Sequence, residues 1–177
     1  MLIRIGPFMM LTMVAGPVLS QGRELAFNLH GTTTDFDSGK PIAEVWVAAT
    51  DTLDRTYVVN AEGDRKGKYE MELPYERVYR VTFSKNGHVT KQVVIDLHGS
   101  SEKERTAGFT MDLEMVLFER LDGVDYSVCD TPIAVCRYDP RKTEFAWDAA
   151  YTKSVKPKLQ ALSSKHTAEP KKGGRKE

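Results

Sequence analysis

The sequence lacks a surplus of charge of either sign, because its 25 lysines and arginines are balanced by 25 aspartates and glutamates. Proteins that bind nucleic acid usually show a clear basic excess, so this balance argues against a nucleic-acid partner. Beyond the N-terminal segment, the chain also lacks any run approaching the roughly 20 apolar residues that a membrane-spanning helix needs. We therefore expect a mature chain that binds no nucleic acid and contains no transmembrane span.

Motifs for catalysis and for metal binding are missing as well. No serine lies in a Gly-x-Ser-x-Gly turn, and no glycine-rich loop follows a predicted strand to cradle phosphate. The four histidines are His30, His88, His98 and His166, and none shows the HxH or HxxxH spacing of a metal pair. A zinc site needs three or four ligands together. The sequence therefore predicts a protein that is not an enzyme, with no catalytic residue, no cofactor and no metal site.

The N-terminal segment MLIRIGPFMMLTMVAGPVLSQG carries the most specific signal in the chain. One early basic residue, Arg4, precedes an apolar stretch over residues 5–19, and the stretch ends in Val18-Leu19-Ser20. This order is typical of a secretory signal peptide. An uncleaved anchor or a buried helix is the alternative, and the glycines and prolines of the segment disfavour both. We expect a signal peptide over residues 1–20, cleaved after Ser20, and a periplasmic or secreted location in the bacterial envelope.

Residues 21–118 are predicted to form one β-sandwich. Short segments alternate apolar and polar residues with a period of two, as in LAFNLHGTT and in GFTMDLEMVL. Turn residues separate them, among them an Asn-Gly pair, which is a strong hairpin signal. About six strands over residues 25–97, without helical periodicity between them, and a further long strand over residues 109–117 indicate a mainly β protein with an antiparallel sandwich.

The remaining chain has a different character. Residues 119–162 read as an irregular extension with a short strand and room for one short helix, which Pro157 would weaken. Residues 163–177 are poor in apolar residues and rich in lysine, and they are predicted to be a disordered tail.

Two cysteines, Cys129 and Cys136, enclose the segment DTPIAV. In an oxidising compartment, a close pair favours a disulfide. If the segment is one extended strand, however, its ends lie roughly 23 Å apart at about 3.3 Å per residue, which is beyond disulfide reach. Pro132 can turn the chain and remove this obstacle. A disulfide, two free thiols and a metal pair all stay open, and the disulfide is the favoured hypothesis.

The segment TDFDSGKPIAEVWV places Asp35 and Asp37 one residue apart, just before Ser38 and Gly39. Carboxylates at this spacing begin some calcium loops, but such loops supply six to eight oxygen ligands. Here Lys40 and Pro41 follow, where further oxygens are needed. Short polar residues before glycine are typical of a tight turn. We interpret Asp35, Asp37, Gly39 and Pro41 as a turn between the first two strands.

The block from Gly31 to Leu97 resembles the carboxypeptidase-regulatory-like domain family, which has a transthyretin-like, or prealbumin-like, sandwich fold. The matching stretches are GTTTDFDSGKPIAEVWV, GKYEMELP and YRVTFSKNGHVTKQVVID. The region from Phe109 to about Leu162 resembles, less sharply, the C-terminal part of envelope proteins from Bacteroidota-type bacteria. The resemblance implies a transthyretin-like or Ig-like antiparallel Greek-key sandwich and an envelope location. Members of the wider family are typically non-catalytic modules attached to peptidases, outer-membrane nutrient receptors and surface proteins.

Three functions are consistent with these observations. The first is a structural or protein-interaction module of the envelope, which would meet an unknown envelope protein through a sheet edge or through the aromatic residues Tyr138, Phe145, Trp147 and Tyr151. The second is a carbohydrate- or peptide-binding module that uses Trp46 or Trp147 as a stacking platform. The third, an accessory subunit of an envelope enzyme or transport system, rests on the resemblance alone.

Overall fold

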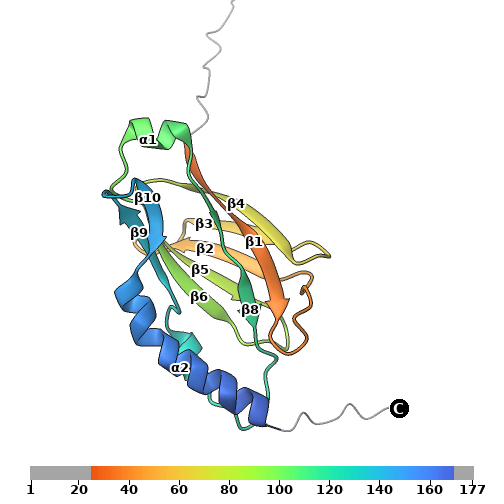
Figure 1. Cartoon of the computed structure of the whole chain (residues 1–177). Helices are drawn as coiled ribbons and strands as arrows, with labels where there is room; N and C mark the ends of the chain where they lie inside the picture. Colours follow the sequence, from red (N-terminus) through yellow and green to blue (C-terminus); the bar gives the residue numbers. More distant parts are fainter. Residues whose placement is uncertain (1–24, 170–177) are drawn as a thin grey trace, which may run out of the picture.

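The fold is seen in a computed structural model that describes residues 25–169. The predicted signal peptide and its cleavage point after Ser20 lie outside the described residues, as does the end of the predicted tail, residues 170–177. The described chain is mainly β and forms a sandwich of two sheets, with a long helix near the C-terminus (Figure 1). None of its helices is both long and apolar enough to span a bilayer.

The first sheet contains β1 (Ala26–Asp35), β4 (Lys68–Pro74), β7 (Thr110–Asp112) and β8 (Met115–Leu117). Its order is β4-β1-β7, and β8 pairs with the C-terminal end of β1. The second sheet contains β2 (Trp46–Asp51), β3 (Val58–Glu62), β5 (Val78–Ser84), β6 (Lys91–Asp96), β9 (Val135–Asp139) and β10 (Glu144–Trp147). Its order is β10-β9-β6-β5-β2-β3.

The alternation predicted from the sequence produces the core between the sheets. In β4, Tyr69, Met71 and Leu73 are buried, while the residues between them are exposed. In β5, Val81 and Phe83 are fully buried and face the same core. A strand with period two places alternate side chains on opposite faces, so one face of each sheet is apolar and packs against the other sheet.

The segment predicted as one strand over residues 109–117 is divided into β7 and β8, and both run parallel to β1. The break occurs where Leu113 crosses over Gly31. A Cβ atom on Gly31 would lie 2.1 Å from the Leu113 carbonyl oxygen, so only glycine allows this approach. Tyr69 of β4 donates its hydroxyl to the same carbonyl at 2.6 Å, which fixes the crossing.

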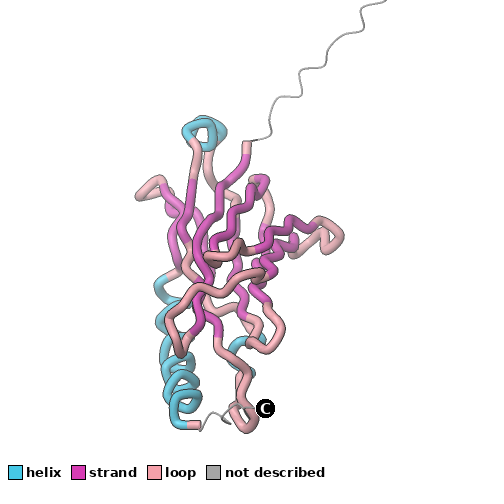
Figure 2. Tube along the Cα trace, turned by 90° about the vertical axis from the view of Figure 1, so that its right-hand side faces the viewer, coloured by secondary structure: helices cyan, strands magenta, loops and turns pink. Residues whose placement is uncertain are grey.

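The C-terminal extension is more regular than the sequence predicts. A short 3-10 helix, η1 (Ser127–Asp130), leads into the β9–β10 hairpin, and β9 joins the second sheet by pairing in parallel with β6. The hairpin is followed by α2 (Ala149–Ala168), a helix of 20 residues. Figure 2 shows α2 at the lower end of the sandwich, away from the short helix α1 (Glu102–Ala107) at the upper end.

Helix α2 corrects two expectations. It continues through Pro157, although proline removes a helical hydrogen bond. It also includes residues 163–168, which were expected to belong to the tail. Tertiary contacts explain both differences: Val155, Leu162 and His166 are buried along one side of the helix, and Asp148 caps its first turn by accepting a hydrogen bond from the Tyr151 N–H.

Candidate functional site

The turn after β1 is held by Asp35. Its Oδ1 atom accepts hydrogen bonds from the Ser38 N–H at 2.8 Å and from the Ser38 hydroxyl at 2.6 Å. Gly39 has a φ of 64°, a left-handed conformation that suits glycine, and Thr34 forms a bridge with Pro41. Partial burial raises the pKa of Asp35, but the hydrogen bonds from Ser38 outweigh this effect and the net pKa is lowered. The described residues contain no group of three side chains that could hold a metal ion.

Asp37, by contrast, points toward the C-terminal helix. Its Oδ2 atom lies 3.0 Å from Nε2 of His166. The other ring nitrogen of His166, Nδ1, lies 2.8 Å from the Tyr126 hydroxyl. Since the His166 side chain is fully buried, both of its nitrogens are satisfied by protein groups. This Asp37–His166–Tyr126 network ties the turn, the extension and α2 together.

Sequence reasoning missed this network because its three members are far apart in the chain and His166 was assigned to a tail. The imidazole also contacts two aromatic rings, with ring centroids 5.4 Å from Phe36 and 5.0 Å from Phe118. Together with Val89, Cys129 and Leu162, these residues form a second, smaller core beneath α2. No sequence signal distinguished His166 from an exposed histidine.

A lysine is buried beside this smaller core. Lys91, the first residue of β6, is only 6% exposed. Its Nζ atom donates to the Val116 carbonyl oxygen at 2.5 Å and lies 4.0 Å from the centre of the Phe118 ring. None of the described carboxylates forms an ion pair with it. Because burial disfavours the charged form, the pKa of Lys91 falls to about 8.

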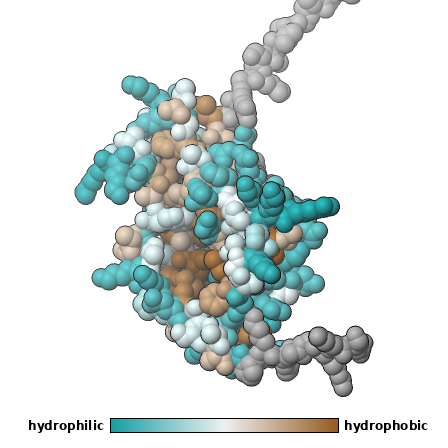
Figure 3. Space-filling model, turned by 45° about the vertical axis from the view of Figure 1, so that its right-hand side comes forward, coloured by the Kyte–Doolittle hydropathy of each residue, from teal (hydrophilic) through white to brown (hydrophobic). Residues whose placement is uncertain are grey.

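Lys91 lines a cavity of about 380 Å³ between α2 and the open edge of the sandwich, hereafter the α2 cavity. Most of its wall is apolar, and this part comprises Phe36, Val116, Phe118, Ile133 and Leu159. The helix adds polar groups, among them the second cation, Lys156. Figure 3 shows an apolar hollow in the lower half of the molecule, the half that contains α2. A cavity of this size and lining, with a few polar groups, is typical of a small-molecule site.

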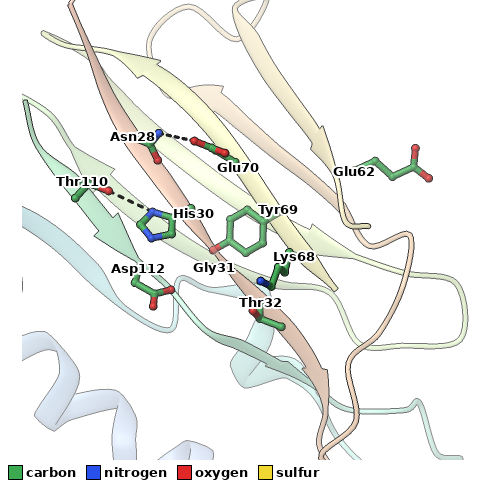
Figure 4. A pocket seen from close by; sticks show the side chains of 10 residues that line it. All are labelled: Asn28, His30, Gly31, Thr32, Glu62, Lys68, Tyr69, Glu70, Thr110 and Asp112. Carbon is green, nitrogen blue, oxygen red and sulfur yellow. Dashed lines mark hydrogen bonds between the residues drawn. The ribbon is translucent and has the colours of Figure 1, made fainter. Parts of the chain in front are cut away.

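A second, larger hollow of about 640 Å³ lies on the outer face of β1, β4 and β7. Figure 4 shows that polar side chains surround it. Several of them pair with one another: Asn28 donates to Glu70 at 2.7 Å, and the Thr110 hydroxyl lies 3.2 Å from Nδ1 of His30. The Oδ1 atom of Asn28 is buried and has no hydrogen-bond partner among the described residues, but Tyr69 is the one large apolar side chain in this lining, so this surface is a weaker binding candidate than the α2 cavity.

The predicted disulfide is absent from the described structure, where both cysteines are free and buried. Cys129 belongs to the smaller core, whereas Cys136 lies in β9 and faces the main core. The chain passes from one core to the other between the two residues, so the thiols occupy separate environments. Burial raises the pKa of Cys136 to about 12 and also raises that of Cys129, so both remain protonated thiols.

The predicted partner-binding aromatic residues are mostly part of the packed structure. Tyr138 donates its hydroxyl to Glu104 at 2.6 Å, and Tyr151 donates to the Pro132 carbonyl at 2.6 Å. Phe145 is buried, and Trp147 packs against the main core. Trp46 alone among the predicted residues is an exposed aromatic, with 48% of its surface accessible.

No protein-family model matches the sequence, and no curated protein matches it. The carboxypeptidase-regulatory-like resemblance therefore stays a prediction.

Several solved structures match in part. One is 3-chlorocatechol 1,2-dioxygenase from Rhodococcus opacus, with a TM-score of 0.42, 11% identity, and coverage of 59% of this chain and 63% of that one. Another is catechol 1,2-dioxygenase from an Acinetobacter species, with a TM-score of 0.42, 19% identity, and coverage of 64% and 59%. The major pilin SpaD from Corynebacterium diphtheriae matches with a TM-score of 0.41, 14% identity, and coverage of 53% and 30%. The chain thus spans less than two thirds of these proteins, and such low scores assign it no activity or partner.

Proposed function

We propose that this protein is a non-catalytic binding module of the bacterial envelope and that its binding site is the α2 cavity. The observation that carries the proposal is an apolar cavity of about 380 Å³ with a buried lysine at its wall. Apolar walls with a small number of polar groups give a site both affinity and orientation. The envelope location is supported by the signal-peptide pattern of residues 1–20.

The binding role is tested with the neutral, environment-sensitive dye Nile red. We expect saturable fluorescence enhancement with the wild-type protein. The substitution Leu159→Trp fills the cavity from α2 and should weaken dye binding at least about tenfold. The matched control is Leu53→Trp, the same change at a residue that is 89% exposed and does not line the cavity. Equal dye binding by both variants would show that the cavity is not the site.

The envelope location is tested separately by expressing the full chain in a bacterial host and sequencing the N-terminus of the protein recovered from the periplasm. A mature chain that begins at Gln21 is the expected result. Recovery of the uncleaved chain in the cytoplasm would contradict the location without affecting the binding site.

Carbohydrate or peptide binding at Trp46 is a second candidate function. Its half-exposed ring lies beside Glu44, Glu62 and Lys85 in a surface hollow of about 530 Å³. An aromatic face flanked by polar side chains suits the stacking of a sugar or a peptide side chain. Tryptophan fluorescence titrations with a glycan panel should then show quenching that Trp46→Ala abolishes. A lack of response to every glycan and peptide in the panel would remove this candidate.

A further inference from the structure

The charge on Lys91 is the feature of the α2 cavity that its apolar lining does not explain. An ammonium group has three N–H donors, and Lys91 uses one of them for the Val116 carbonyl oxygen. The Phe118 ring face adds a favourable contact, but it carries no formal charge. Buried charges in proteins are normally paired or hydrogen-bonded throughout. Lys91 therefore has unused capacity for an anionic acceptor.

The cavity has a positive electrostatic character. Of the described residues that line it, none is acidic, while Lys91 and Lys156 approach from β6 and α2 respectively. Thr152, Gln160 and Ser163 add neutral hydrogen-bonding groups along the helix. Lys156 is exposed, whereas Lys91 is buried in a largely apolar surrounding, where a cation attracts a negative charge more strongly than it would in water.

The segment that follows the described residues is mostly basic. Residues 170–177, PKKGGRKE, contain four lysines and arginines and one glutamate, so they carry the same sign as the cavity. Charge complementarity therefore favours a ligand from outside the chain. The shape of the lining adds a second requirement, because apolar side chains form most of the wall. A small inorganic anion would leave that wall uncovered.

We propose that the α2 cavity binds a free amphipathic monocarboxylate, such as a medium-chain fatty acid, with its carboxylate at Lys91 and its hydrocarbon body against Phe36, Val116, Ile133 and Leu159. This inference rests on the proposed function, since it specifies the ligand of the same site. The carboxylate accepts the unused N–H donors of Lys91, and charge-assisted hydrogen bonds of this kind are the strong ones. The hydrocarbon chain covers the apolar wall and contributes affinity in proportion to the area removed from water.

The experiment compares two probes that share one apolar body, octanoate and octanol, by displacement of Nile red from the full mature chain. We expect the wild-type protein to bind octanoate about tenfold more tightly than octanol, because only the acid makes a charge-assisted contact. Lys91→Met keeps an unbranched apolar side chain and should bind the two probes equally. The control Lys158→Met makes the same change on α2 at an exposed residue outside the cavity, and it should keep the tenfold preference.

The outcomes separate the two proposals. If the wild-type protein binds octanol as tightly as octanoate, or if Lys91→Met retains the preference for the acid, the ligand assignment is overturned while the cavity remains a binding site. If Nile red does not bind at all, the proposed function itself fails. A loss of preference in Lys156→Met alone, with Lys91→Met unchanged, would place the carboxylate at the helix and contradict the role of Lys91.

Discussion

Replacing Lys91 by methionine should stabilise the ligand-free protein at neutral pH, although it removes a hydrogen bond and a ring contact. Lysine at this position is 6% exposed and lacks a carboxylate partner among the described residues. Methionine has a similar unbranched stem, so it can fill the same space without leaving a buried charge. Replacing buried charges by apolar residues of similar volume is often neutral or stabilising.

The size of the expected stabilisation follows from the pKa of Lys91. Burial lowers the pKa of Lys91 from 10.5 to about 8. At about 1.36 kcal/mol per pKa unit, the buried charge costs about 3 kcal/mol of folding free energy. The substitution also loses the hydrogen bond to Val116, worth about 1 kcal/mol, and the contact with Phe118, worth about 0.5 to 1 kcal/mol. We therefore expect a net stabilisation of about 1 to 2 kcal/mol at pH 7.

The direction in which the stability of the wild-type protein changes with pH follows from the same lowered pKa. The folded-state pKa of Lys91 lies below its unfolded value, so the penalty is complete below pH 8 and disappears as the pH rises toward 10.5. The wild-type protein should thus gain stability relative to Lys91→Met across this window, and the variant's advantage should vanish within it, before its upper end. Above pH 10.5, the lost contacts leave the variant less stable than the wild-type protein.

Urea denaturation of both proteins at several values between pH 7 and pH 10.5 provides the measurement, with Lys158→Met as the control for loss of one lysine. A variant that is less stable than the wild type by more than about 1 kcal/mol at pH 7 would show that the charge is compensated within the protein. The reasoning would also be refuted by a stability difference that does not change with pH.

The remaining predictions concern packing and thiol chemistry. Gly31→Ala should destabilise the protein by more than about 2 kcal/mol in urea denaturation, because the new Cβ would lie 2.1 Å from the Leu113 carbonyl oxygen. An unchanged midpoint would show that the crossing relaxes easily. His166→Ala should cost about 2 to 4 kcal/mol, since it leaves a cavity and removes one hydrogen bond from each of Asp37 and Tyr126, and the loss of helical circular dichroism should accompany it. A neutral effect would mean that α2 docks without this ring. Cys129 and Cys136 should react with a thiol reagent only after unfolding, and the native mass should not change with reductant; rapid labelling of the folded protein would contradict their burial.

The β-sandwich could be predicted because its signals are local. The Tyr69-Met71-Leu73 alternation specifies a strand with one buried face wherever the strand is placed, since side chains of an extended chain alternate between faces. The turn around Asp35 could be predicted equally well, because its hydrogen bonds join residues three positions apart. The parallel pairing of β8 with β1 and of β9 with β6 could not be predicted from the sequence, since parallel pairing joins segments distant in sequence and leaves no turn signal.

The candidate site could not be predicted from the sequence for the same reason. Lys91 follows a turn and precedes an apolar run, so it resembled the exposed first residue of a strand, and only the approach of Val116 and Phe118 buries it. His166 stood in a lysine-rich segment that resembled a tail. Its burial depends on contacts with Phe36, Asp37 and Tyr126 from other parts of the chain.

By itself, the sequence determined most strands of residues 25–97, the tight turn after the first strand and the mainly β class, because these depend on side-chain alternation and on short-range hydrogen bonds. Only the tertiary structure decided that α2 continues through Pro157, that the cysteines occupy separate cores, and that a cation lies in an apolar cavity. Each of these depends on which distant segments pack together, and packing changes the solvation of a side chain without changing its neighbours in sequence.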